Sequence, residues 1–261
     1  MLTEAQVEEF DAKGFLNGGL ALNRDQVEAL RRELTQVIDN RDDADTSQPL
    51  LQRNATSAPN KLVWQIVNIW EVSDVFRALL SNRKIVEEIA QLTRASELRV
   101  WHDQIQYKPP EVGGVNRWHQ DAPLWPILHP KTQVTAWTAL DDVDESNGCM
   151  SMVSGSYRWG DQIEFLQQKL DTFEDLPAEF NGRKVEALRC PVRMGEVHYH
   201  HGMTWHASHA NTSAGPRRAI AIHYMTQETR YDASGEHVMK PFVEVADGEL
   251  LKGKYFPQVW P

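Results

Sequence analysis

The sequence predicts a mainly β protein, a sandwich or barrel of short strands with flanking α-helices packed outside it. Helical periodicity is concentrated in about the first 95 residues, and segments of alternating polarity follow it. Several of these segments carry polar residues along one face, which indicates a barrel whose interior holds a site. A length of 261 residues fits a single domain with a sizeable core.

Two helices are expected near the start of the chain. Thr3 can cap a helix over residues 4–12, with Gln6 at the capping-box position. Asn23 precedes a second helix over residues 24–40, whose apolar residues recur at helical spacing. Both segments therefore combine a start signal with an apolar face that can pack on a core.

The rest of the N-terminal part is expected to be a loop followed by a third helix. Residues 41–60 are polar and rich in turn formers, so we expect a long loop of the kind that often closes over a site. The third helix is expected over residues 81–94. The N-terminal helices thus occupy about residues 1–95.

Strands dominate from residue 98 onward. The first segment alternates in polarity, and one of its faces carries His102, Gln104, Gln106 and Lys108. Asn147-Gly148 is a strong hairpin signal. Further strands are expected over residues 98–108, 133–140, 189–199 and 217–226. A β core over about residues 96–230 results, with a helix-then-loop insertion at 160–185 and a C-terminal extension over about 231–261.

Composition excludes several classes of partner. The formal net charge is −10 at pH 7, whereas binding to phosphate backbones or anionic membranes needs clustered Lys and Arg. No segment approaches the roughly 18 apolar residues of a membrane span, and the acidic N-terminus is no secretion signal. We therefore expect a cytoplasmic protein that acts on a small molecule. Its oligomeric state is left open, and Cys149 and Cys190 are expected to be free thiols.

Two polar segments far apart in the chain indicate a metal site. His119 and Asp121 are two positions apart, so on a strand their side chains point the same way. His206, brought in from a neighbouring strand, would complete a set of two imidazoles and one carboxylate. This set holds non-heme Fe(II) and leaves three open positions on it, for a bidentate 2-oxoacid and for O2.

Arg217 suits the second carboxylate of such a 2-oxoacid, because a guanidinium pairs with a carboxylate through two parallel hydrogen bonds. It lies eleven positions after His206. If the strand that begins at Arg217 pairs antiparallel with the strand that carries His206, both side chains face the same interior. Ser208, two positions after His206, can add a hydrogen bond.

At this point the sequence resembles the phytanoyl-CoA dioxygenase family of Fe(II)- and 2-oxoglutarate-dependent oxygenases. That family folds as a double-stranded β-helix, a jelly-roll or cupin-like core. The resemblance covers nearly the whole chain and is weakest at residues 40–95 and 160–190. Its most specific segments are residues 2–16, 137–143, 146–156 and 206–217.

The resemblance implies a role for each site residue. His119, Asp121 and His206 would be the iron ligands at the catalytic centre. Arg217, supported by Ser208, would pair with the 5-carboxylate of 2-oxoglutarate. The implied reaction uses O2, converts 2-oxoglutarate to succinate and CO2, and hydroxylates an unactivated C–H bond of the substrate.

Three further residues are implied around the cosubstrate. Trp137 stands where the family often has a tryptophan that lines the cosubstrate pocket, and Gln104 or Gln106 would approach the other end of 2-oxoglutarate. Asp121 also bears on whether hydroxylation or halogenation is expected, because related halogenases have a small residue in place of this carboxylate. Its presence favours hydroxylation over halogenation.

Candidate substrate contacts are less specific. Trp125, four positions after Asp121, is the best candidate for an aromatic wall, which would suit an apolar or quaternary ammonium substrate. Lys108 and Arg117 could meet an anionic substrate, and surface charge is the alternative for both. Nothing in the sequence marks a site for coenzyme A, so the substrate in the family's name is not assumed.

Two other functions fit the same residues. A zinc-dependent hydrolase could use the same triad, but Arg217 would then have no role. A non-catalytic cupin-like binding protein is the second alternative, and the intact triad argues against it. The histidines 198, 200 and 201 are expected to contribute polarity around the site rather than a second metal.

Overall fold

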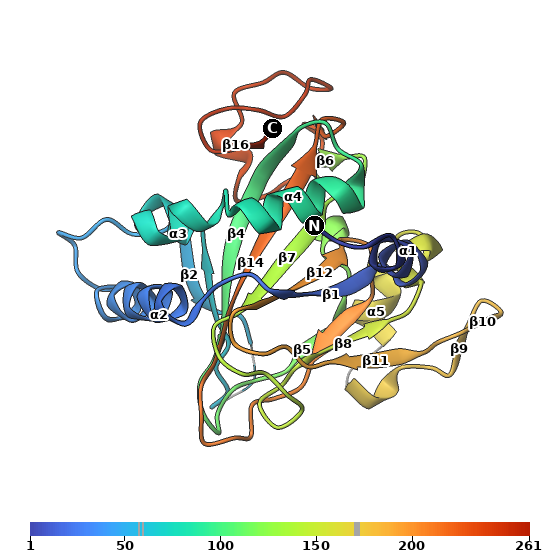
Figure 1. Cartoon of the computed structure of the whole chain (residues 1–261), viewed down its shortest axis with the longest axis horizontal. Coiled ribbons are helices and arrows are strands. Elements are labelled where there is room, and N and C mark those ends of the chain that lie inside the picture. The colour runs from blue at the N-terminus through green and yellow to red at the C-terminus, as the bar shows by residue number, and fades with distance from the viewer. Residues whose placement is uncertain (57, 59, 170–172) are drawn as a thin grey trace.

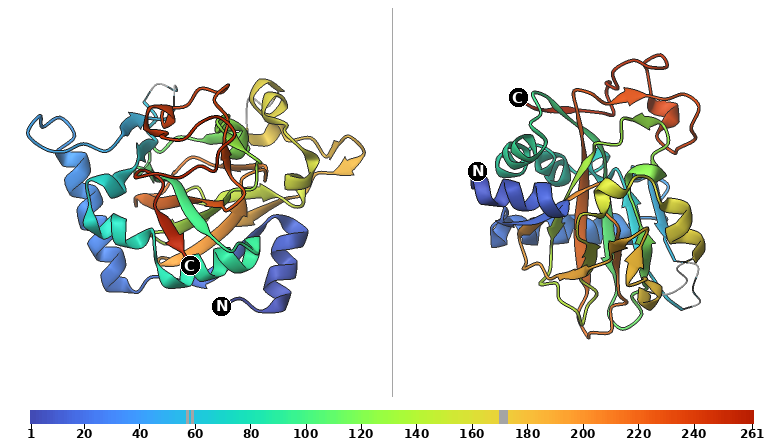
Figure 2. Two further views of the ribbon diagram at one scale, coloured as in Figure 1. Left: turned by 90° about the horizontal axis from the view of Figure 1, so that it is seen from above. Right: turned by 90° about the vertical axis from the view of Figure 1, so that its right-hand side faces the viewer.

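The computed structural model describes residues 1–56, 58, 60–169 and 173–261, and two facing antiparallel sheets form its centre (Figures 1 and 2). Helices lie against the outer face of the larger sheet, while the smaller sheet closes the other side. This arrangement confirms the mainly β class and the double-stranded β-helix core.

The helices begin where the sequence places caps. Thr3 and Asn23 each accept a hydrogen bond from the backbone of the residue three positions on, and both capping boxes are complete. The helices of the described residues are α1 (Glu4–Lys13), α2 (Arg24–Asp39), α3 (Asp74–Leu79), α4 (Arg83–Thr93), α5 (Ile163–Lys169), and the 3₁₀ turns η1 (Ile69–Glu71), η2 (Ala122–Leu124), η3 (Ser156–Trp159), η4 (Phe173–Asp175) and η5 (Lys240–Phe242).

The larger sheet has the order β1-β12-β7-β14-β4-β3-β2, with β16 also pairing with β4. Its central strands are buried on both faces, because one face meets the helices and the other faces the smaller sheet. Its strands are β1 (Phe15–Leu20), β2 (Leu51–Asn54), β3 (Trp64–Val67), β4 (Leu98–Lys108), β7 (Val134–Ala139), β12 (Glu196–His201), β14 (Arg217–Thr226) and β16 (Gln258–Trp260).

The smaller sheet has the order β11-β8-β13-β5. Two short antiparallel pairs lie apart from it, and the β9–β10 pair projects from the body of the molecule (Figure 1). The strands concerned are β5 (Asn116–His119), β8 (Met150–Val153), β11 (Ala187–Cys190), β13 (His206–Ser208), and the paired β9 (Glu179–Phe180) with β10 (Arg183–Lys184) and β6 (Leu128–His129) with β15 (Arg230–Tyr231).

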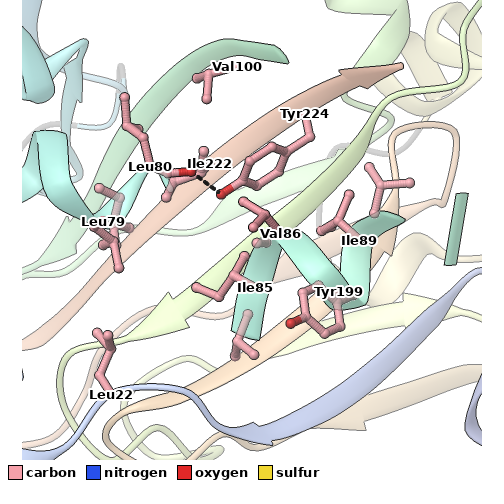
Figure 3. Packing of buried hydrophobic residues seen from close by; sticks show 14 of the residues in the cluster. Leu22, Leu79, Leu80, Ile85, Val86, Ile89, Val100, Tyr199, Ile222 and Tyr224 are labelled. Carbon is pink, nitrogen blue, oxygen red and sulfur yellow. Dashed lines mark hydrogen bonds between the residues drawn. The ribbon is translucent and has the colours of Figure 1, made fainter. Parts of the chain in front are cut away.

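The main hydrophobic core lies between α4 and the outer face of the larger sheet. Ile85 and Ile89 of α4 are fully buried and face Tyr199 of β12 and Tyr224 of β14 (Figure 3). The Tyr224 hydroxyl donates to the carbonyl of Leu80 at 3.0 Å. A fully buried side chain of this size contributes roughly 1.5–3 kcal/mol, so this layer holds the sheet rigid beneath the site.

The expected boundary between N-terminal helices and β core was wrong. Strands β1, β2 and β3 all lie before residue 95 and extend the larger sheet at both of its ends. Residues 51–54 of the expected loop 41–60 form β2, which pairs antiparallel with β3. Positions 57 and 59 of that loop lie outside the described residues. The short strands were missed because each is four to six residues long and needs its partner to form.

Two further expectations about strands were wrong. The expected strand 189–199 is two strands in different sheets, because Pro191 has no N–H to donate to a ladder and Gly195 has a φ of +83°. Asn147-Gly148 does not close a hairpin between neighbouring strands. It belongs to the turn by which the chain crosses from β7 in the larger sheet to β8 in the smaller one.

Candidate metal centre and adjoining cavities

Two histidines meet across the smaller sheet. Strands β5 and β13 are antiparallel neighbours, and His119 is the direct partner of His206 in their register. Residues opposite each other across such a pair project from the same face. The two imidazole rings accordingly lie with their centroids 4.1 Å apart.

Asp121 reaches the same point from outside the strand. β5 ends at His119, and Asp121 stands at the start of the 3₁₀ turn η2 with φ −74° and ψ −52°, so the expected strand alternation does not place it. Its Oδ1 nevertheless lies 3.5 Å from Nε2 of His119 and 3.5 Å from Nε2 of His206. The turn, rather than the strand, aims the carboxylate.

The donor set of this cluster fits a metal ion. Among the described residues, these three side chains form the group of potential metal ligands whose ligand atoms all lie within 4.8 Å of one another. Nδ1 of His119 donates to the carbonyl of Arg117 at 2.7 Å, and Nδ1 of His206 donates to the carbonyl of Thr204 at 3.0 Å. Each ring therefore presents the lone pair of Nε2 to the centre, as a metal-binding imidazole does.

The second oxygen of Asp121 is held separately. His200 Nε2 and Thr135 Oγ each donate to Oδ2 at 3.2 Å. These two bonds fix the carboxylate plane and leave Oδ1 directed at the two imidazoles. His200 thus adds to the polarity around the site, as expected, whereas His198 and His201 line neither of the cavities at the cluster. Thr135 was not singled out from the sequence.

The electrostatics keep the carboxylate ionised. Burial alone would raise the pKa of Asp121, but His206, His119 and His200 together hold it well below its usual range. Burial and the neighbouring His119 lower the pKa of His206 well below its usual range. The cluster therefore presents one carboxylate charge and unprotonated His206, which suits a divalent cation.

Arg217 faces the cluster from the opposite sheet. β14 pairs with β4 and β7, so the pairing of the strands that carry His206 and Arg217, which the sequence left as a condition, does not form. The two sheets face each other instead, and Arg217 Nη2 reaches Ser208 Oγ at 3.3 Å. The Arg217 guanidinium lies over the ring of Trp137, 5.5 Å from its centroid.

The guanidinium of Arg217 is buried without a matching carboxylate. Among the described residues no acidic side chain forms an ion pair with it, and its Nε has no hydrogen-bond partner. Burial lowers the pKa of Arg217 to about 10, so it stays charged at neutral pH. A buried cation of this kind is costly unless an anion binds to it.

Lys108 is also buried beside this anchor. Its Nζ donates to Ser208 Oγ at 2.7 Å and to the carbonyl of Ser208 at 3.2 Å. Burial, and then the charge of Arg217, lower the pKa of Lys108 well below its usual range. Lys108 lines neither of the cavities at the cluster, so the structure places it with Arg217 rather than at a substrate.

Two connected cavities adjoin the cluster. The inner one, about 50 Å³, lies between the triad and Arg217, and Gln104, Gln106 and Trp137 line it. The outer one, about 410 Å³, shares His119 and Asp121 with the inner cavity. Its remaining walls include Trp125, and three histidines that the sequence did not single out for the site: His102, His223 and His237.

The other predicted residues take distinct places. Gln104 accepts a hydrogen bond from Gln65 at 2.8 Å, and Gln106 accepts one from Asn116 at 3.3 Å. Arg117 is exposed and lines a separate surface depression that also reaches His119. The polar alternation of residues 98–108 could have identified His102 as a residue of the site. His237 lies in the C-terminal segment, where no local pattern in the sequence indicates a role at the site.

A jelly-roll that brings two imidazoles and one carboxylate together, opposite a buried arginine, defines the class of non-heme iron and 2-oxoglutarate-dependent oxygenases. Comparison with known proteins agrees. The profile of the family described as phytanoyl-CoA dioxygenase (PhyH) matches residues 10–219. The chain belongs to this family, whose members are dioxygenases that use iron, 2-oxoglutarate and O2.

Individual relatives extend the comparison. The peroxisomal phytanoyl-CoA dioxygenase of Mus musculus is 22% identical over 270 residues, which cover 95% of this chain and 76% of the relative. Phytanoyl-CoA dioxygenase 1 of Oryza sativa subsp. japonica is 25% identical, over 87% of this chain and 90% of the relative. Among solved structures, the non-heme alpha ketoglutarate dependent carbocyclase SnoK from nogalamycin biosynthesis is 26% identical with a TM-score of 0.81, over 99% of this chain and 96% of that one.

Among the described residues, no helix is both long enough and apolar enough to span a membrane.

Proposed function

We propose that this protein hydroxylates an unactivated C–H bond of a small molecule, with release of succinate and CO2. The observation that carries the proposal is the convergence of His119 Nε2, Asp121 Oδ1 and His206 Nε2 on one point, across a cavity from an unpaired buried guanidinium, Arg217.

His119, Asp121 and His206 would hold the iron. Iron bound there supplies the oxidising chemistry, through O2 and 2-oxoglutarate. The protein contributes orientation: the carbonyls of Arg117 and Thr204 fix the two imidazole tautomers. Without these bonds each ring could turn its protonated nitrogen inward and lose its affinity for a metal.

Arg217 and Ser208, which line the inner cavity, would hold the 5-carboxylate of 2-oxoglutarate, and Lys108 would position Ser208 from behind. Arg217 supplies the positive charge, and its bond to an anion is strengthened because water is excluded from this buried place. Trp137 would bound the carbon chain, and Gln104 or Gln106 would approach the opposite end. Lys108 is thus reassigned from a contact with the substrate to the support of Ser208.

The substrate would bind in the outer cavity, where Trp125 forms a wall beside the metal ligands. Trp125 is 5% exposed and keeps water from that side of the centre. Arg117 lies at the neighbouring surface depression, where it could meet a charged part of a larger substrate. The acidic net charge of the chain supports a small-molecule substrate rather than nucleic acid or an anionic membrane.

An anaerobic titration of the metal-free protein with Fe(II) and 2-oxoglutarate tests the proposal. The expected result is a weak visible metal-to-ligand charge-transfer band that disappears in His119→Ala and weakens in Arg217→Ala. Arg189→Ala, at an exposed arginine outside both cavities, is the control and should retain the band.

Absence of the band from the unaltered protein, together with tight zinc binding, would refute the proposal and favour a hydrolase. A band without succinate release for any of a broad set of substrates would favour the non-catalytic binding protein. Succinate release coupled to substrate oxidation separates the dioxygenase from both alternatives.

A further inference from the structure

A chain of hydrogen bonds leads from Asp121 into the outer cavity. The Thr135 hydroxyl lies 3.2 Å from Asp121 Oδ2 and 2.8 Å from Nδ1 of His223. A hydroxyl has one proton to donate, and an ionised carboxylate can only accept. Thr135 therefore donates to Asp121 and accepts from His223, so the proton of the His223 ring is on Nδ1.

This tautomer leaves a lone pair on Nε2 of His223. Among the residues that the structure describes, no protein group bonds that nitrogen. His223 lines both the inner and the outer cavity, so the acceptor lies beside the metal cluster and within reach of a bound molecule. The ring of Trp125, 4.6 Å away between centroids, packs against His223 and limits its rotation.

The histidines of the outer cavity are polar but uncharged. Burial lowers the pKa of His223 and of His237 to about 4, and that of His102 well below its usual range. His237 accepts a hydrogen bond at Nδ1 from the backbone of Met239, so its Nε2 carries the proton and can donate. At neutral pH these three side chains offer hydrogen-bonding groups and no charge, and the cation Arg53, elsewhere in the lining of the outer cavity, donates from Nε to Gln65 at 2.6 Å.

We propose that Nε2 of His223 accepts a hydrogen bond from a hydroxyl group of the substrate, and that the part of the substrate next to the metal is therefore a neutral alcohol or phenol. The inference rests on the proposed function, since it concerns the substrate of the same site. The hydroxyl would set which C–H bond faces the metal ligands, which makes His223 a specificity-determining residue.

The tautomer can be tested without iron, cosubstrate or turnover. Long-range ¹H–¹⁵N correlation spectra of the metal-free protein labelled with [¹⁵N]histidine distinguish a protonated from an unprotonated ring nitrogen, and His223→Gln identifies the signals. We expect Nδ1 protonated and Nε2 unprotonated in the unaltered protein and in the control Thr135→Ser. In Thr135→Val, which removes the hydroxyl, the preference should be lost. A proton on Nε2 of the unaltered protein would overturn the proposal.

Hydroxyl recognition can be tested with phenol, anisole and benzoate as probes. Phenol should shift the His223 Nε2 signal and bind about five-fold more tightly than anisole, the effect of one hydrogen bond between neutral groups. Benzoate should leave that signal unchanged. Equal shifts from phenol and anisole, or none from either, would contradict the inference.

These outcomes are independent of the proposed function. A missing charge-transfer band with Fe(II) and 2-oxoglutarate would refute the dioxygenase, whereas the spectra of the metal-free protein would still report on His223. A normal band with the opposite tautomer would refute only the substrate class.

Discussion

At the scale of single residues, the site is defined by charges that lack partners inside the protein. Arg217 and Lys108 are buried beside each other, and among the described residues neither forms an ion pair with an acidic side chain. Burial of the Arg217 charge without a carboxylate destabilises the empty site. Binding of a carboxylate removes this penalty, and Lys108 contributes by holding Ser208 beside Arg217.

We therefore expect Lys108→Met to weaken 2-oxoglutarate binding about ten-fold, because the substitution removes the bonds that orient Ser208 beside Arg217. Anaerobic titration of the visible band measures the dissociation constant directly. Lys184→Met, at a lysine that is 80% exposed, is the control. Unchanged affinity in a folded Lys108→Met protein would show that Lys108 has only a structural role.

At the scale of elements, the crossing from the larger to the smaller sheet depends on one glycine. Gly148 has a φ of +87°, and a Cβ at this position would lie 2.4 Å from the carbonyl oxygen of His209. The Gly148 carbonyl also accepts a hydrogen bond from Arg217 Nη2 at 3.2 Å. The turn thus ties the packing of the two sheets to the position of the guanidinium.

Gly148→Ala should lower the free energy of unfolding by about 2–4 kcal/mol, the sum of a left-handed backbone and a steric overlap. Gly182→Ala is the matched control, because Gly182 has a φ of +75° but nothing within 4 Å of its added Cβ. The Gly182→Ala substitution should lower the free energy of unfolding by only about 1 kcal/mol. Urea denaturation followed by circular dichroism gives both values, and similar losses would mean that the turn tolerates the side chain.

At the scale of the whole molecule, a buried carboxyl should make stability depend on pH. Asp103 on β4 accepts a hydrogen bond from the backbone of Ile69 at 2.9 Å, while its Oδ2 has no partner. Burial raises its pKa from 3.8 to about 8. Between these values the folded state binds a proton that the unfolded state has released, so this contribution to stability is complete below about 4 and is lost as pH rises through about 8.

Asp103→Asn removes this dependence, because the amide does not titrate. Relative to the unaltered protein, the free energy of unfolding of the variant should increase as pH rises from about 4 to about 8. Urea midpoints of the two proteins at several pH values within that window measure the difference. A constant difference would show that Asp103 has an ordinary pKa in the folded state.

Several features were predictable because their causes are local. The capping boxes at Thr3 and Asn23 each need only four consecutive residues, and both helices form where they were expected. The strand over residues 98–108 was identified within its exact limits because eleven alternating residues outweigh any competing pattern. The short strands β1 and β2 lacked such a signal, since a four- to six-residue strand is stabilised by its neighbours.

By itself the sequence determined the fold class, the family and the side chains that converge on the centre, because these follow from residue types and spacings along the chain. Only the tertiary structure decided how they meet: Asp121 is placed by a turn, Arg217 faces His206 from the opposite sheet, and Thr135 links Asp121 to His223. The physical reason is that strand pairing and buried hydrogen bonds join residues across long separations in the chain, and such partners satisfy one another only when the sheets are assembled.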